Sequence, residues 1–263
     1  MDCYIIPTVN NLDLMYEGKG NRFYALAHFY VQYPHYREFF LNIKKKDPSA
    51  TILLDNSAAE KSLVTEEILL DIVKELKPDE VIALDILFDK DKTIEATQSF
   101  INHMISQKLI NDTKIFGCPQ GKNKEEWIEC YDWMLQHSYI TTIGLSKIAV
   151  PKCWGNINEE DVGIAESRNR AYDFLLKTDR IKKPLHFLGM GDIREYNHYD
   201  KSNPLIRSTD SCYTVLAAVN GVDFSKGDFR RIKTTNDFYT LTLSEKQIKL
   251  AKSNIEALKF ILA

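Results

Sequence analysis

The sequence has little glycine, proline and cysteine, with 11 Gly, 8 Pro and 5 Cys in 263 residues. So few glycines and prolines exclude a collagen-like chain and a flexible linker composition. The cysteines are odd in number, scattered, and form no CxxC pair: Cys3, Cys118, Cys130, Cys153 and Cys212. This spacing argues against a disulfide framework and against a structural zinc site. The sequence therefore predicts reduced cysteines, no structural metal and no cofactor.

The sequence also lacks a large excess of charge of one sign and any long hydrophobic run. There are 34 Lys and Arg against 37 Asp and Glu, for a formal net charge of −3. This balance excludes a polybasic nucleic-acid binder, although a local basic face is still compatible with it. No apolar run approaches the roughly 18 residues that a membrane span needs, and the first residues do not resemble a signal peptide. We expect a cytoplasmic protein with no membrane partner.

What the sequence does contain is an ordinary globular composition. Hydrophobic residues make up 44%, charged residues 27% and aromatic residues 11%. These values exclude disorder as the main state, and the length suffices for one large α/β domain or two small ones. Because no linker rich in Pro, Gly or Ser interrupts the chain, we expect a single domain over residues 1–263.

Short apolar runs alternate with longer stretches of helical spacing. The expected strands are residues 3–7, 51–55, 80–85, 114–117, 139–144 and 185–189, with weaker candidates at 205–208 and 147–150. The expected helices are residues 63–76, 91–108, 124–136, 158–177 and 244–262. Residues 15–36, rich in aromatics, are either an insertion near the site or a first long crossover.

The strands are apolar without clean alternation, as in a parallel sheet covered by helices on both faces. Seven or eight β-α units in this length predict a TIM-type (β/α)₈ barrel, a fold that needs about 250 residues. The rival fold is a doubly wound open sheet, but no GxGxxG follows the first strand.

Polar residues stand at the ends of several expected strands. Asp55, Asp85, Gln120 and Asp210 each follow such a run, and Gly144 closes another. In a barrel of this kind the C-terminal strand ends form the site, so these residues are expected to converge on one mouth. A single Asp in such a place is often only a helix N-cap. It is therefore the occurrence of several polar residues at successive strand ends that indicates a site.

Six short motifs resemble the tRNA-guanine transglycosylase superfamily, in the family's order and about its spacing, over residues 50–221. They are LDNS at 54–57, LD at 84–85, FGCPQG at 116–121, IGLS at 143–146, FLGMG at 187–191 and STDSC at 208–212. The resemblance implies a TIM barrel that exchanges a guanine in a nucleic acid for a free 7-deazaguanine base such as preQ0. It also implies a covalent aspartyl-glycosyl intermediate.

The resemblance implies a role for each matching residue. Asp210 matches the nucleophile, and Asp55 matches the general acid and base. The implied base-binding residues are Asp85, Gln120, Gly121, Gly144, Leu145, Leu188 and Gly189.

Three departures from the family pattern point to one branch of it. Ala59 stands where the family has a stacking aromatic, and the family's zinc site has no counterpart. Residues 212–218 replace the Pro-Thr-Arg stretch that follows the nucleophile. These losses resemble the compact DNA-guanine transglycosylases of phages and bacterial DNA-modification systems. They imply a barrel without a zinc subdomain, DNA as the polymer with tRNA as the alternative, and the cytoplasm of a bacterium or a phage-infected host.

The residues support this chemistry without the family as well. Replacing a base at C1′ with retention asks for a carboxylate nucleophile and a second carboxyl that moves a proton. Asp210 and Asp55 are the candidates, and Asp85 can accept hydrogen bonds from a guanine-like edge. The target nucleotide must be flipped out of a duplex or single-stranded, because C1′ is otherwise out of reach.

Phosphate contacts are expected from basic residues late in the chain: Arg207, Lys226, Arg230, Arg231 and Lys233. A solvated charged loop is the alternative for the stretch 226–233, and a barrel-rim ion pair is the alternative for Arg207. His186 lies in an apolar run and is more typical of a hydrogen-bonded core histidine than of a site residue.

Three other functions stay open from the sequence. A tRNA-acting enzyme would use the same chemistry. A non-catalytic barrel subunit is disfavoured by the intact carboxylates. A two-carboxylate glycoside hydrolase is disfavoured because only Trp127, Trp133 and Trp154 are present to form sugar platforms. The sequence does not determine the oligomeric state or a need for a partner protein.

Overall fold

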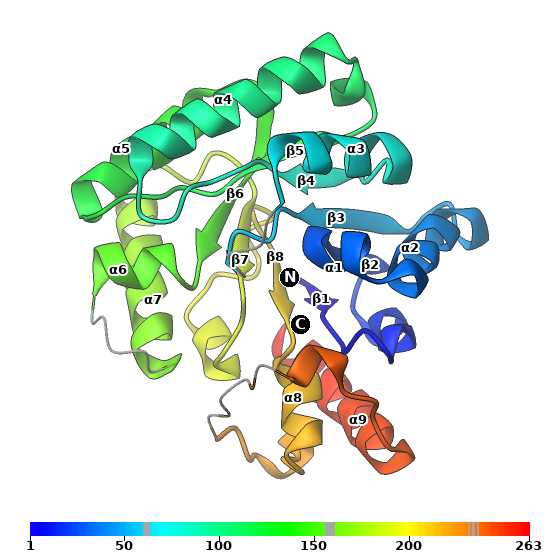
Figure 1. The fold of residues 1–263 in the computed structure, drawn as a ribbon. Helices are drawn as coiled ribbons and strands as arrows, with labels where there is room; N and C mark the ends of the chain where they lie inside the picture. The colour runs from blue at the N-terminus through cyan, green and yellow to red at the C-terminus, as the bar shows by residue number, and fades with distance from the viewer. Residues whose placement is uncertain (60–63, 156–160, 231, 233–234, 236) are drawn as a thin grey trace.

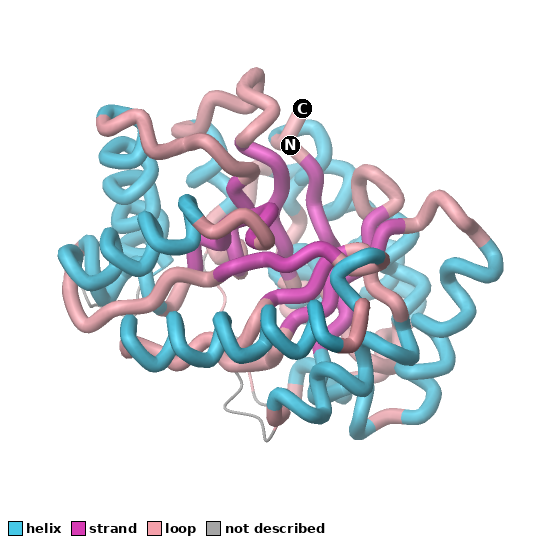
Figure 2. Tube along the Cα trace, turned by 90° about the horizontal axis from the view of Figure 1, so that it is seen from above, coloured by secondary structure: helices cyan, strands magenta, loops and turns pink. Residues whose placement is uncertain are grey.

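Eight short parallel strands form one sheet in the computed structural model, which describes residues 1–59, 64–155, 161–230, 232, 235 and 237–263. Helices surround the strands on the outside (Figures 1 and 2). The strands are β1 Asp2–Ile5, β2 Arg22–Leu26, β3 Thr51–Asp55, β4 Glu80–Ile82, β5 Lys114–Gly117, β6 Ile140–Ser146, β7 Leu185–Leu188 and β8 Ile206–Ser211. The expected (β/α)₈ TIM-type barrel is confirmed.

The outer layer consists of helices that follow the strands. They are α1 Ala27–Gln32, α2 Pro34–Lys46, α3 Glu66–Leu76, α4 Lys90–Ser106, α5 Lys124–Gln136, α6 Ala149–Trp154, α7 Asp161–Lys177, α8 Tyr213–Val219 and α9 Glu245–Ile261. Side-chain caps explain where several begin: Thr65, Asn123 and Ser244 each accept a backbone N–H of the first turn of α3, α5 and α9. Among the described residues, no helix is long and apolar enough to cross a membrane.

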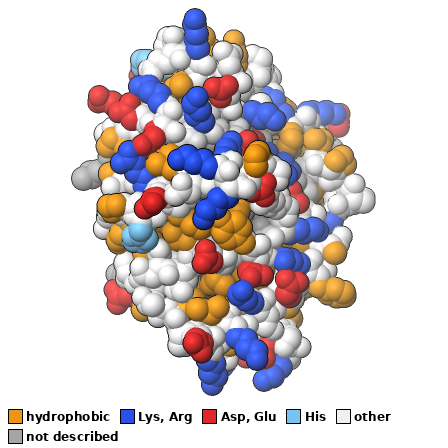
Figure 3. All heavy atoms as spheres, turned by 90° about the vertical axis from the view of Figure 1, so that its right-hand side faces the viewer, with side chains coloured by type: hydrophobic (Ala, Val, Ile, Leu, Met, Phe, Trp, Pro, Cys, Tyr) orange, Lys and Arg blue, Asp and Glu red, His pale blue; other side chains and the backbone are white. Residues whose placement is uncertain are grey.

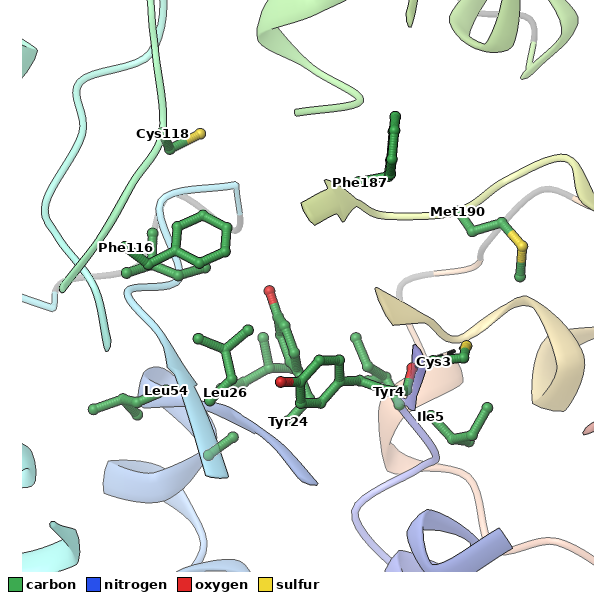
Figure 4. Close-up of a cluster of buried hydrophobic side chains, with 14 of the residues drawn as sticks. Cys3, Tyr4, Ile5, Tyr24, Leu26, Leu54, Phe116, Cys118, Phe187 and Met190 are labelled. Carbon is green, nitrogen blue, oxygen red and sulfur yellow. Dashed lines mark hydrogen bonds between the residues drawn. The ribbon is translucent and has the colours of Figure 1, made fainter. Parts of the chain in front are cut away.

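The barrel closes at a junction between β1 and β2 that we call the seam. The hydrogen-bonded ladder starts at β1 and runs through β8, β7, β6, β5, β4 and β3 to β2, so these two strands are its ends. Side chains join them: Asp2 pairs with Arg22, and the rings of Tyr4 and Tyr24 lie 5.8 Å apart in an edge contact. Figure 4 shows these two tyrosines side by side.

Most expected elements occur near their expected bounds. The strands at 51–55 and 114–117 and the helix at 124–136 have the bounds that the sequence predicts. Two expectations were wrong. Residues 147–150 are not a strand but a turn and the start of α6, and residues 15–36 contain a strand of the barrel, β2. Leu63 and the first three residues of the helix expected at 158–177 lie outside the described residues.

Candidate active site

A pocket of about 730 Å³, including space open to solvent, lies at the C-terminal ends of the strands. Its lining includes Asp55 at the end of β3, Asp85 just after β4, and Asp210 in β8. Leu188 and Gly189 line it from the end of β7. The structure thus brings together the three aspartates that the sequence placed at one mouth.

Asp210 is almost fully buried, and one of its oxygens is held by two donors. Oδ1 accepts the Gly189 backbone N–H at 2.9 Å and a hydrogen bond from His186 Nε2 at 3.0 Å. Gly189 has φ +72°, and a Cβ there would lie 2.5 Å from the Lys147 side chain. A side chain at this position would strain the backbone and displace Lys147, so glycine suits it.

Asp55 is held from both of its oxygens. Tyr24 Oη donates to Oδ2 at 2.6 Å, and the Ser57 backbone N–H donates to Oδ1 at 2.6 Å. Ser57 has φ 61°, a left-handed conformation that a short polar side chain tolerates better than a bulky one. The tight turn after β3 thus fixes the carboxylate at the pocket wall.

Asp85 sits between two amide donors. Asn56 Nδ2 donates to Oδ1 at 2.7 Å, and Gln120 Nε2 donates to Oδ2. Burial raises the pKa of Asp85 to about 6, although both donors act in the opposite direction. The amides are fixed in turn, since Asn56 also donates to the Ala83 carbonyl and Gln120 Oε1 accepts the Phe88 N–H. Asp85 is therefore a buried carboxyl that titrates close to neutral pH.

Four expected base-binding residues lie around the pocket rather than in its lining. Gln120 is fully buried behind Asp85, and Leu145 is fully buried in β6. A Cβ on Gly144 would lie 2.6 Å from the Phe116 ring, and one on Gly121 would lie 2.5 Å from a backbone nitrogen of α5. These glycines serve close packing around the site, and Gln120 positions Asp85.

The described members of the expected phosphate-contact set do not line the pocket. The Arg207 guanidinium pairs with Glu80 at 2.8 Å, near the N-terminal ends of β4 and β8, and Arg207 is not in the lining of the pocket. Its barrel ion pair was the alternative interpretation. Lys226 and Arg230 are exposed and pair with nearby aspartates. Arg231 and Lys233 lie outside the described residues.

Several pocket residues were not predicted from the sequence. Lys147 brings a positive charge to the described lining, and its alkyl chain lies over Gly189. Tyr24 and Tyr239 supply rings, while Ala59, where the expected aromatic is missing, also lines the pocket. Lys147 directly follows the IGLS motif, a signal that the sequence did contain. The tyrosines come from distant segments, and no local pattern marks them.

Within the described ranges, no group of three or more His, Cys, Asp or Glu side chains is placed to hold a metal ion. The arrangement combines a buried carboxylate with one oxygen held, a second carboxylate, and a carboxyl clamped by amides. Such a set can attack a carbon, move a proton and bind a donor-rich ring edge. Comparison with known protein families gives no match, and comparison with curated proteins gives no significant match either.

Proposed function

We propose that the chain is a DNA-guanine transglycosylase that exchanges a guanine for a 7-deazaguanine base such as preQ0. The observation that carries this proposal is the convergence of Asp55, Asp85 and Asp210 from three strands on one pocket. The three differ in environment, and carboxyls in different environments take different roles.

Base recognition falls to Asp85. A guanine-like edge presents N–H donors, and the ionised carboxylate accepts them while Asn56 and Gln120 hold it in place. The rings of Tyr24 and Tyr239 line the same pocket and offer flat surfaces for the base where Ala59 offers none.

The reaction proceeds as two displacements. Asp210 forms a bond to C1′ as the C1′–N9 bond breaks, and the departing guanine takes both bonding electrons and a proton from Asp55. The incoming 7-deazaguanine then gives its N9 proton to Asp55, and N9 attacks C1′ and releases the Asp210 carboxylate. Two displacements retain the configuration at C1′, as in retaining glycosidases.

The polymer must present an unpaired nucleotide, which costs a few kcal/mol in a duplex. Lys147 lines the pocket, and its positive charge supports a contact with a backbone phosphate. Basic and acidic side chains alternate on the face drawn in Figure 3, in keeping with the net charge of −3. A surface of mixed charge favours modest, salt-sensitive binding of the polymer.

The test supplies labelled guanine, and in parallel labelled 7-deazaguanine, with equal nucleotide concentrations of duplex DNA, single-stranded DNA and bulk tRNA. We expect label in DNA. Label confined to tRNA would overturn the choice of polymer and leave the chemistry standing. No label in any polymer would overturn the enzyme and favour a binding subunit.

The matched variants are Asp210→Asn and Asp132→Asn. Asp132 lies in α5 and pairs with Arg180, outside the pocket. Asp210→Asn is expected to fold, to lose exchange, and to form no denaturation-resistant adduct with the polymer. Asp132→Asn is expected to keep both. An adduct in the Asp210→Asn variant would assign the nucleophile to another residue.

A further inference from the structure

A continuous chain of hydrogen bonds runs through the barrel to Asp210. It begins at Glu80 in β4, which accepts from Arg207 Nη1 and from Thr142 Oγ1, both at 2.8 Å. Arg207 Nε donates to Ser208 Oγ at 3.1 Å, and Ser208 Oγ lies 2.8 Å from His186 Nδ1. His186 Nε2 then reaches Asp210 Oδ1 at 3.0 Å.

The donors along this chain follow from chemistry. An arginine Nε can only donate, so Ser208 Oγ accepts there and directs its own hydrogen to His186 Nδ1. His186 is fully buried, which lowers its pKa and keeps the ring neutral. A neutral ring that accepts at Nδ1 carries its proton on Nε2, and that proton points at Asp210.

The two carboxylate oxygens of Asp210 differ in their hydrogen bonds. Oδ1 takes both side-chain and backbone donors, His186 and Gly189, whereas Oδ2 has no hydrogen bond from the residues that the structure describes. A carboxylate with one oxygen fixed by two donors is locked about its terminal torsion. Its second oxygen keeps full electron density for attack.

We propose that His186 is a positioning residue that holds Asp210 by Oδ1 so that Oδ2 is the oxygen that attacks C1′. Ser208 and Arg207 set the tautomer that this role requires. The inference rests on the proposed function, because it assigns the attacking atom of the same nucleophile. It gives His186 more than a core role, although its ring also packs among Tyr4, Tyr24 and Phe116.

The test compares three variants of the chain with the wild type in base exchange. His186→Leu fills the buried position with an apolar side chain and removes the donor to Asp210. We expect kcat to fall about 100-fold, the cost of a misplaced reacting group. KM for the free base is expected to stay unchanged, since Asp85 binds the base. His186→Gln places an amide N–H near the Nε2 position and is expected to recover most of kcat.

Ser208→Ala is the milder variant, because the His186 ring stays and loses only the hydroxyl that fixes its tautomer. A loss of about tenfold in kcat is expected, with slower formation of the trapped adduct at unchanged final yield. His198→Leu is the matched control: this histidine pairs with Asp173 on the outside and does not line the pocket. It should exchange bases like the wild type.

The outcomes separate this inference from the proposed function. An inactive wild type would overturn the function itself. An active wild type with full kcat in His186→Leu, or with a loss in KM alone, would overturn the positioning role. If His186→Leu does not fold by circular dichroism, the test rests on His186→Gln and Ser208→Ala. Equal, full activity in both His186→Leu and Ser208→Ala, or a Gln variant no better than Leu, would also overturn the role.

Discussion

Asp85 is a buried carboxyl whose protonation state depends on pH. Burial raises its pKa from 3.8 to about 6, so the folded protein binds this proton more tightly than the unfolded chain does. The resulting stability is fully present below the unfolded pKa and is lost as the pH rises through about 6. The difference between the two values corresponds to about 3 kcal/mol. At neutral pH the fold therefore holds an ionised, costly carboxylate.

Asp85→Asn is expected to remove this pH dependence. Between about pH 4 and about pH 7.5, the variant should gain up to about 3 kcal/mol in unfolding free energy relative to the wild type. Urea unfolding at both pH values measures the difference. Asp91→Asn, at a highly exposed carboxyl, is the control: it keeps Asp85, so its stability should follow that of the wild type at both pH values. A constant offset between Asp85→Asn and the wild type would contradict the buried titration.

Recognition and bond cleavage are expected to separate between two aspartates. Asp85→Ala should mainly raise KM for the free base, because the buried donors of Asn56 and Gln120 lose their partner and the base loses its acceptor. Asp55→Asn should mainly lower kcat. In the wild type, KM for the base should fall as the pH rises through about 6 and Asp85 ionises. A large loss of kcat in Asp85→Ala at unchanged KM would reverse the assignment.

The residues that could be predicted are those that a strand end marks. Asp55, Asp85 and Asp210 each follow an apolar run, and position alone placed them at the mouth. The hydrogen bonds of His186 and Tyr24 join neighbouring strands, β7 to β8 and β2 to β3. They depend on the register between strands, which no local pattern contains. Gln120 follows an apolar run as the aspartates do, but its burial and its hydrogen bond to Asp85 could not be predicted from that position.

At the scale of elements, α7 is tied to two strand ends by one buried side chain. Arg168 is fully buried and donates to the Leu188 carbonyl at 2.8 Å and more weakly to that of Leu145 at 3.5 Å. Its charge is balanced by Glu195 at 2.6 Å, and Tyr199 donates to the same carboxylate. The ends of β6 and β7, which carry part of the pocket, are therefore held from behind by the helix.

Arg168→Met is expected to destabilise the protein by about 3–5 kcal/mol, because Glu195 is left as a buried, unpaired charge. The double variant with Glu195→Gln should recover part of this loss. Arg170→Met, two residues away on the same helix, breaks an exposed pair with Glu166 and should change stability by less than about 1 kcal/mol. Urea unfolding of all three measures this. Equal losses of stability in Arg168→Met and Arg170→Met would contradict a special role for the buried Arg168–Glu195 pair.

Strands and helices could be predicted from the sequence where a loop separates them from the next element. β2 was missed because α1 follows it without a connecting residue, so strand and helix patterns merge within one aromatic segment. The strand expected at 147–150 fails for a related reason. β6 extends to Ser146, whose hydroxyl accepts the N–H groups of Ile148 and Ala149 and turns the chain into α6. Capping of this kind is visible only once the strand end is known.

At the scale of the whole molecule, the distribution of charge decides how the polymer binds. Arg207 is paired with Glu80 inside the barrel, so Lys147 is the basic side chain in the described lining of the pocket. Lys147→Gln is expected to reduce the salt slope of DNA binding by about 0.9, one phosphate contact, with KM for the free base unchanged. Binding measured over a series of salt concentrations gives the slope.

Lys226→Gln is the comparison for that measurement. Lys226 is exposed and pairs with Asp223, and it belongs to the basic stretch that the sequence favoured. A slope reduced by Lys226→Gln and not by Lys147→Gln would place the polymer along residues 226–233 instead.

The seam should be the least protected part of the barrel. β1 and β2 end the ladder and are joined there by the Asp2–Arg22 pair and the Tyr4–Tyr24 contact. Asp2→Ala should cost less than about 1 kcal/mol overall. It should nevertheless speed amide hydrogen exchange in β1 and β2 while leaving β5 and β6 unchanged. A uniform increase across all strands would indicate global unfolding and contradict a local weakness.

The seam also divides the chemistry. Asp210 lies on β8, beside β1, and Asp55 lies on β3, beside β2, so the short way round the barrel between them crosses this junction. Tyr24 spans from the seam to Asp55. Because β1 and β2 share no ladder of hydrogen bonds, a change in the spacing of this junction would alter the distance between Asp210 and Asp55. The barrel thus resembles a ring whose two ends meet between the aspartates that we propose as nucleophile and proton carrier.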